Sequence, residues 1–195
     1  MRGSILAVRH ADPSTQYLTA ASLDGYIADE HHSLSWLFSV QQGEDAQERW
    51  SGFLDGVGAM VMGATTYLWC LDHDDFLEHP DRWHGSYGDR PCWVFSHRDL
   101  PAIPGADLRF VQGHVAEPHA EMRDAAGGLN VWLVGGGELV GAFHDAGLLD
   151  EVRVHLAPVT LGAGAPLLPR RIEGMRLRSA EQHGQLVELV YDVPR

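Results

Sequence analysis

Residues 131–139 have the sequence VWLVGGGEL, an uninterrupted apolar run that leads into three glycines and then into an amphipathic stretch. Glycine lets a backbone approach an anion without interference from a Cβ atom, and the free N–H groups at the start of a helix favour a pyrophosphate. The segment therefore predicts a strand, a turn and a helix arranged to cradle a phosphate. A tight turn without a ligand would give the same pattern, so both interpretations stay open.

Apolar runs and helical periodicities extend outward from this segment in both directions. The sequence predicts strands at residues 17–22, 59–62, 91–96, 130–134, 151–156 and 185–193, and helices at residues 43–57 and 138–146. Strands that alternate with helices are typical of a layered α/β domain. We find no repeat and no linker, so we expect an irregular N-terminal extension over residues 1–16 and a single domain over residues 17–195.

Composition and charge limit the possible partners. The 195 residues are 45% hydrophobic and 21% charged, as in a packed domain, and 14 Lys and Arg against 27 Asp and Glu give a net charge of -13. This charge repels nucleic acid and anionic membranes, whereas backbone amides and a local Arg can still bind an anionic cofactor. Two cysteines and no long apolar run predict a cytoplasmic protein without a membrane helix.

The common nucleotide-binding and metal-binding motifs are absent from the sequence. A dinucleotide fingerprint that starts at Gly135 or at Gly162 would need a further glycine where Val140 and Leu167 stand, and no phosphate-binding P-loop occurs. The twelve histidines show no ligand spacing of the HExxH type, so we predict no metal site. A Rossmann domain and a P-loop hydrolase are both disfavoured.

Five segments stand out when they are taken in order: TAASLDGYIA (residues 19–28), VMGATTY (61–67), VFSHR (94–98), LVGGGEL (133–139) and PVTLGAGAP (158–166). Together they resemble the dihydrofolate reductase family, and in particular its branch related to the reductase domain of riboflavin biosynthesis. The resemblance implies a three-layer α/β/α fold with a mixed, mostly parallel sheet. It also implies a homodimer that uses NADPH to reduce a small pteridine-like or pyrimidine-like heterocycle.

The resemblance implies a set of cofactor-binding residues. Gly63 and Thr66 would hold phosphates, the glycines from Gly135 would hold the pyrophosphate and the nicotinamide side, and Arg98 would bind the 2′-phosphate that distinguishes NADPH from NADH. The full set is Ala21, Gly63, Thr65, Thr66, Ser96, His97, Arg98, Val134, Gly135, Gly136, Gly137, Glu138 and Leu139. The chain departs from the family at Ala64, where many relatives have Arg, and at Val134, where the riboflavin-pathway reductases have Glu.

The candidate catalytic residues are Asp24 and Glu48. Folate enzymes protonate the pterin with an acid on the first long helix; here Gln47 occupies the expected position and Glu48 is adjacent, although Glu48 also fits a surface charge. Asp24 ends the first strand beside the expected nicotinamide position, and ordinary turn chemistry explains it equally well. The alternative function is therefore a dinucleotide-binding or ligand-binding protein without turnover.

Overall fold

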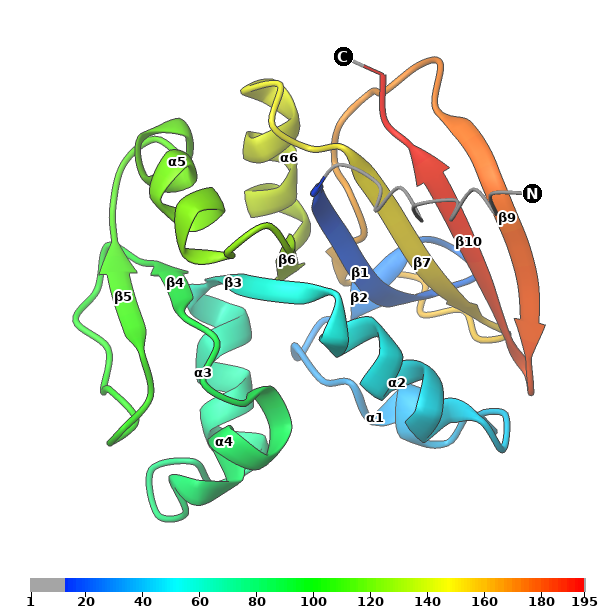
Figure 1. The fold of residues 1–195 in the computed structure, drawn as a ribbon. Helices are drawn as coiled ribbons and strands as arrows, with labels where there is room; N and C mark the ends of the chain where they lie inside the picture. Colours follow the sequence, from blue (N-terminus) through cyan, green and yellow to red (C-terminus); the bar gives the residue numbers. More distant parts are fainter. Residues whose placement is uncertain (1–12, 195) are drawn as a thin grey trace, which may run out of the picture.

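The computed structural model describes residues 13–194. Its helices and strands, in chain order, are β1 (Thr15–Ser22), β2 (Tyr26–Ala28), α1 (Ser35–Phe38), α2 (Ala46–Asp55), β3 (Val57–Gly63), α3 (Ala64–His73), α4 (Asp81–Tyr87), β4 (Cys92–Phe95), β5 (Leu108–Val111), α5 (Ala116–Ala125), β6 (Asn130–Gly135), α6 (Gly137–Asp145), β7 (Glu151–Ala157), β8 (Ala165–Pro166), β9 (Arg176–His183) and β10 (Leu186–Asp192) (Figure 1).

Eight of these strands form one sheet in the order β5-β4-β3-β6-β1-β7-β10-β9 (Figure 1). The first six strands of this order are parallel, β10 is antiparallel to β7, and β9 is antiparallel to β10. A separate short ribbon pairs β2 with β8. The predicted mixed, mostly parallel sheet is confirmed.

Helices cover both faces of the sheet, because side chains of successive strand residues point to opposite faces. In β6, Val131 and Leu133 belong to the core that includes Phe143 of α6, whereas Trp132 packs with Trp83 of α4 in the core on the other face. Helices α5 and α6 therefore form one outer layer, and α2, α3 and α4 form the other (Figure 1). The predicted three-layer fold is confirmed.

Arg90 joins three elements on the face that carries α2 and α4. Its guanidinium donates hydrogen bonds to the carbonyl oxygens of Leu54 at 2.6 Å, Tyr87 at 2.7 Å and Val57 at 2.8 Å. A planar fork with five donors can reach three carbonyls at once, which a single ammonium cannot do in the same geometry. Arg90 thus holds the ends of α2 and α4 against the start of β3.

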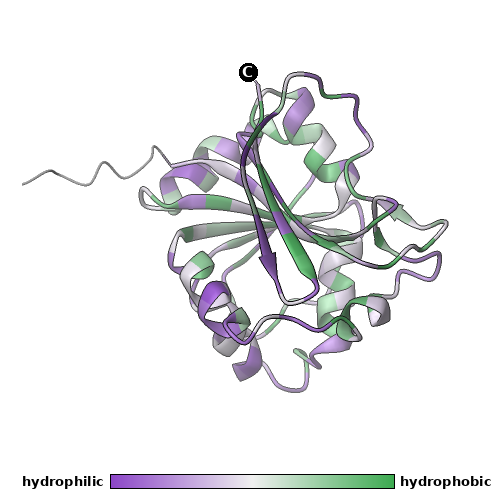
Figure 2. Ribbon diagram, turned by 90° about the vertical axis from the view of Figure 1, so that its right-hand side faces the viewer, coloured by the Kyte–Doolittle hydropathy of each residue, from purple (hydrophilic) through white to green (hydrophobic). Residues whose placement is uncertain are grey.

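The structure corrects the predicted start of the domain. Strand β1 begins at Thr15, two positions before the predicted start, and Thr15 and Gln16 are both buried in the sheet. These polar residues had been placed in the irregular extension, of which residues 1–12 lie outside the described residues. The predicted strands also omitted β9, whose side chains are mostly exposed; Figure 2 shows this outermost strand as predominantly hydrophilic beside the apolar β10.

Candidate functional site

The sheet has a switch point between β3 and β6. These strands are parallel neighbours, yet β3 leads into α3 on one face and β6 leads into α6 on the other. Helices that leave adjacent strands in opposite directions open a crevice at the carboxyl ends of the strands, where α/β proteins commonly bind ligands. The N-termini of α3 and α6 both lie at this crevice.

Two glycine turns meet in the crevice. A Cβ atom placed on Gly63 would lie 3.7 Å from the carbonyl oxygen of Gly135 and 3.8 Å from the backbone nitrogen of Gly136. Gly63 has φ -81° and ψ 160°, an extended conformation open to any residue, and those contacts are of ordinary length. Neither the backbone conformation nor packing therefore requires a glycine at position 63. The absence of a side chain there leaves the backbone N–H and C=O groups of the turn uncovered, a bare peptide edge.

The second turn adds to this bare edge. A Cβ atom on Gly136 would meet no atom closer than Ile27 Cδ1 at 3.9 Å, and the peptide bond between Gly135 and Gly136 is cis. Gly135 lies against Thr66, since its Cβ position is 3.3 Å from Thr66 Oγ1. Gly135 and Thr66, both in the predicted cofactor set, therefore lie side by side.

Other residues of the predicted cofactor set have contacts within the protein that account for them. A Cβ atom on Gly137 would overlap the carbonyl oxygens of Pro166 and Leu167, so this glycine is needed for packing. Glu138 points outward and forms an ion pair with Arg170 at 3.0 Å. Leu139 packs on the core below α6, and Ala21 is wholly buried in β1. Contact of these four residues with a cofactor stays a prediction.

A third turn follows β4 at the same edge, because Phe95 pairs with Gly63 in the sheet. The Ser96 hydroxyl donates to the carbonyl oxygen of Arg98 at 2.8 Å and accepts the Arg98 N–H at 2.9 Å, so it closes the turn. The side chains of His97 and Arg98 are exposed, as is Thr65 at the start of α3. The Arg98 guanidinium is therefore accessible to a phosphate, whereas the Ser96 hydroxyl already has two partners.

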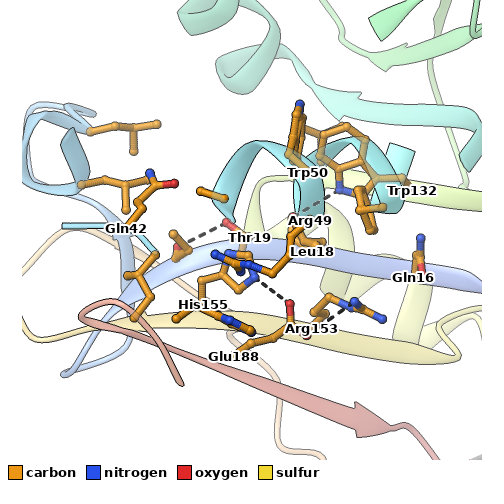
Figure 3. Close-up of a pocket in the computed structure, with 18 of the residues that line it drawn as sticks. Gln16, Leu18, Thr19, Gln42, Arg49, Trp50, Trp132, Arg153, His155 and Glu188 are labelled. Carbon is orange, nitrogen blue, oxygen red and sulfur yellow. Dashed lines mark hydrogen bonds and ion pairs between the residues drawn. The ribbon is translucent and has the colours of Figure 1, made fainter. Parts of the chain in front are cut away.

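A cavity of about 940 Å³ adjoins the glycine turns and shares Thr66 and Val134 with them. One wall is aromatic: the rings of Trp50 and Phe53 on α2 meet Trp132 of β6 edge to face, with centroid distances of 5.4 and 5.2 Å (Figure 3). Such a surface suits a planar apolar or heteroaromatic group. The cavity is therefore large enough for a small heterocycle beside a cofactor.

The floor of the cavity is polar and comes from β7 and β10. His155 donates from Nε2 to Glu188 Oε2 at 2.8 Å, because an ionised carboxylate only accepts, and Arg153 Nη1 lies 3.5 Å from Glu188 Oε1 (Figure 3). The hydrogen bond from His155 lowers the pKa of Glu188, with further help from Arg153, and outweighs the opposing effect of burial. Glu188 is therefore an ionised group held between the imidazole of His155 and the guanidinium of Arg153.

Two more polar side chains reach the cavity from its other walls. Gln16 in β1 is only 3% exposed, and its amide Nε2 has no hydrogen-bond partner among residues 13–194 (Figure 3). A buried amide donor without a partner costs free energy, which a ligand with an acceptor atom would recover. Arg49 on α2 lines the cavity and pairs with Asp45 at 3.1 Å.

Neither predicted catalytic residue faces this cavity. Gln47 of α2 lines it, but Glu48 is turned away by roughly 100° on the helix and is exposed to solvent. Glu48 as the acid therefore stays a prediction that the cavity lining does not support. This leaves no carboxylate of α2 on the cavity wall among the described residues.

The Asp24 carboxylate is hydrogen-bonded within the protein. Its carboxylate accepts hydrogen bonds from the Ser22 hydroxyl at 2.6 Å and from the backbone nitrogens of Leu161 at 3.1 Å and Gly162 at 2.7 Å. The bonds from Ser22 and Gly162 lower the pKa of Asp24 to about 2. Asp24 therefore ties the turn after β1 to residues 161–162 and lies outside the cavity lining, as ordinary turn chemistry would have it, and its role in catalysis stays a prediction.

Two findings concern metal ions and membranes. Across residues 13–194, no three His, Cys, Asp or Glu side chains are grouped in a way that would hold a metal ion. No helix in that range combines the length and the apolar character needed to cross a membrane.

The family model described as "RibD C-terminal domain" matches residues 86–187. The chain belongs to this family. The Bacillus subtilis (strain 168) protein YwjB is 30% identical over 174 residues, which cover 88% of this chain and 93% of YwjB. The likeness to YwjB therefore extends beyond residues 86–187 to most of the chain.

Solved structures of the RibD C-terminal type share the architecture. A protein assigned to riboflavin biosynthesis from Shewanella sp. PV-4 is 26% identical, with a TM-score of 0.75 over 93% of this chain and 99% of that one. A pyrimidine reductase-like protein from Corynebacterium diphtheriae is 15% identical, with a TM-score of 0.62 over 94% of this chain and 92% of that one. The predicted family resemblance is confirmed.

Proposed function

We propose that the protein is an NADPH-dependent reductase that transfers a hydride to a small pteridine-like or pyrimidine-like heterocycle. The observation that carries the proposal is the junction of two bare glycine turns with a cavity that has one aromatic wall and a polar floor. The junction lies at Thr66 and Val134, which belong to both. A reductase of this kind needs a phosphate-binding edge and a pocket for a planar substrate in contact with each other.

The residues present fit a reduced nicotinamide dinucleotide, which supplies a hydride when it is bound. Backbone N–H groups at the starts of α3 and α6 face the crevice and attract phosphates, and Arg98 is accessible for the additional 2′-phosphate. Trp50 and Trp132 would pack beside the flat substrate ring, while the amide of Gln16 would donate to one of its acceptor atoms. These groups bind and orient the substrate next to the cofactor site.

A titration with NADPH, followed by tryptophan fluorescence and by calorimetry, tests the cofactor site. We expect saturable binding by the wild type and at least tenfold weaker binding by Gly63→Val, because the added methyl groups would occupy the bare peptide edge. Gly85→Val is the matched control, since Gly85 lies on exposed α4 with no atom within 4 Å of its Cβ position. A wild-type protein that gives no signal at millimolar NADPH would refute the proposal.

The second candidate is a protein of the same fold that binds a dinucleotide or another ligand without turnover. It is favoured by Gln47, an amide that stands on α2 where a reductase of folates would carry an acid. NADPH oxidation, measured with dihydrofolate, a pterin and a ribitylaminopyrimidine as substrates, distinguishes the two candidates. Oxidation that depends on one of these substrates supports the reductase, and tight binding without oxidation supports the second candidate.

By its family resemblance we also propose a cytoplasmic homodimer. Sedimentation equilibrium of the purified chain at micromolar concentration measures the stoichiometry directly. A monomer over the whole concentration range would contradict the dimer and leave the proposed reaction untouched.

A further inference from the structure

We propose that His155 donates the proton that accompanies hydride transfer, and that Glu188 is the residue that positions and charges it. This inference rests on the proposed reductase function and assigns its missing acid to the sheet floor, away from α2. The pair joins neighbouring antiparallel strands, since His155 of β7 is directly opposite Glu188 of β10. A rigid sheet thus holds both groups below the cavity.

The chemistry calls for such a donor. Hydride addition to the carbon of a C=N bond leaves the electron pair and negative charge on the nitrogen, which must gain a proton from a nearby group. At the α2 position where folate enzymes carry their acid, the cavity is lined by Gln47, and a neutral amide has no proton to give at ordinary pH. Among the residues that line the cavity, those of a type that titrates near neutral pH are His73, His155 and His183.

The contacts of the three histidines separate them. His73 is stacked between Phe38 and Trp69, with ring centroids 5.0 and 4.4 Å away, at the rim formed by α1 and α3. His183 on the outermost strand has its nearest carboxylate oxygens at 3.9 Å, beyond hydrogen-bond distance. His155 alone of the three has a carboxylate within hydrogen-bond distance, at 2.8 Å. It is also the one whose strand pairs with β1, where it lies opposite Ala20.

The orientation of the imidazole follows from that hydrogen bond. Nε2 carries a hydrogen because its partner is a carboxylate, which fixes the ring and leaves Nδ1 as the second nitrogen. Within residues 13–194, Nδ1 of His155 makes no hydrogen bond to the protein. When the ring is charged, Nδ1 therefore carries the proton that can leave.

The charges around the ring determine which form is favoured. Glu188 lies on β10 and stays ionised, and its carboxylate accepts the hydrogen bond from the His155 ring. Opposing positive charges come from Arg153 on β7 and Arg49 on α2, while β9 contributes Glu181 and His183. Glu188 is the one carboxylate in contact with His155, and its removal should therefore favour the neutral ring.

The step balances as a two-electron reduction. The reduced nicotinamide supplies the hydride to the substrate carbon, the C=N bond becomes a C–N single bond, and the proton on Nδ1 of His155 moves to the nitrogen. The ring is left neutral, with Nε2–H still bonded to Glu188, and a proton from solvent restores the imidazolium after product release. The nicotinamide leaves in its oxidised form.

Three variants test the assignment: His155→Gln, Glu188→Gln and the matched control His84→Gln, whose histidine is on exposed α4 and pairs with Asp89. We expect His155→Gln to lower kcat by about 100-fold or more with NADPH affinity unchanged, as for the loss of a general acid. Glu188→Gln should move the alkaline limb of the kcat profile to lower pH. His84→Gln should match the wild type in both measurements.

A second measurement needs neither substrate nor cofactor. Side-chain nitrogen NMR of the ligand-free protein follows the His155 ring, and we expect it to lose its proton at lower pH in Glu188→Gln than in the wild type. A wild-type kcat in His155→Gln, or an unchanged kcat profile and NMR titration in Glu188→Gln, would overturn the assignment while leaving the reductase intact. A wild-type protein that does not bind NADPH, or binds it without turnover, overturns the proposed function and this inference together.

Discussion

Gly137 and Gly63 offer a direct test of why glycines stand in the crevice. Both lie at the start of a helix, and the structure predicts opposite responses to the addition of one methyl group. In Gly137→Ala the new Cβ would lie 2.6 Å from the carbonyl oxygen of Leu167 and closer still to that of Pro166, so the 165–168 segment must move. Overpacking of this kind costs about 1–3 kcal/mol.

Gly63→Ala should be nearly neutral for stability. Its Cβ would have contacts of 3.7 Å or longer, and the backbone already has an extended conformation. A gain of about 0.4–1 kcal/mol from the less flexible unfolded chain is offset by the loss of glycine at a helix N-cap. For a chain of this size each kcal/mol changes Tm by about 2–4 °C, so we expect a fall of about 2–12 °C in Gly137→Ala and less than about 2 °C in Gly63→Ala.

Thermal unfolding of the ligand-free proteins by circular dichroism measures both values. The wild type and the two variants are compared in the same buffer, without NADPH, so that ligand binding does not contribute to Tm. Equal Tm values for the two variants would refute the distinction between a glycine needed for packing and a glycine that leaves an open edge.

Three further predictions concern side chains outside the cavity. Arg98→Ala should weaken NADPH more than NADH, by about 1–3 kcal/mol, and equal losses measured by calorimetry would exclude contact with the 2′-phosphate. Asp24→Asn should speed hydrogen exchange at the Gly162 amide. Because the pKa of Asp24 is lowered to about 2, the wild-type contact should persist at neutral pH and be lost only as the pH falls from about 4 through about 2. An exchange rate that responds neither to the substitution nor to this fall in pH would contradict the contact. Arg90→Ala should lower the free energy of unfolding by about 2–4 kcal/mol, with Arg90→Lys restoring only part of it in urea titrations; a loss below about 0.5 kcal/mol would show that its three carbonyl contacts are not stabilising.

The central strands could be predicted from the sequence because burial on both faces leaves a continuous apolar run. Residues 130–134 and 91–96 show this pattern, and they form β6 and β4 within one residue at either end. The same rule fails at β9, an edge strand with mostly polar side chains, and at Thr15 and Gln16, which are polar yet buried. Hydropathy reports burial of apolar groups, so polar residues inside a sheet and exposed strands at its edge escape it.

The candidate site could be predicted only in part, for a related reason. The glycine turns are contiguous in sequence and have a recognisable composition, and their adjacency follows from the parallel pairing of β3 and β6. Several polar side chains of the cavity come from β1, β7 and β10, and only the strand order brings these strands together. A signal was present in β7, where Arg153 and His155 alternate with valines and so share one face. Without its neighbours, that face resembles the solvated side of any strand.

The direction in which each side chain of a helix points explains why Glu48 lies away from the cavity. The predicted helix over residues 43–57 is present as α2. The way α2 packs on the sheet determines which of its side chains face the cavity, and Gln47 is one of them. A displacement of one residue carries a side chain from the cavity to the surface. An acid can therefore be assigned from spacing only when the boundary of the helix is known to within one position.

The place of β1 between β6 and β7 has a consequence for synthesis on the ribosome. The neighbours of β1 in the sheet come late in the chain. The Ser14 amide, just before β1, donates to the Asn130 side chain at the start of β6, 116 positions away, so most of the chain must emerge before β1 has a strand to pair with in the sheet. Until then Tyr17, Leu18 and Ala21 have no core to enter, and long-range pairing of this kind slows folding and exposes the nascent chain to aggregation. The cavity can therefore form only after β7 and β10, which supply its floor, have been synthesised.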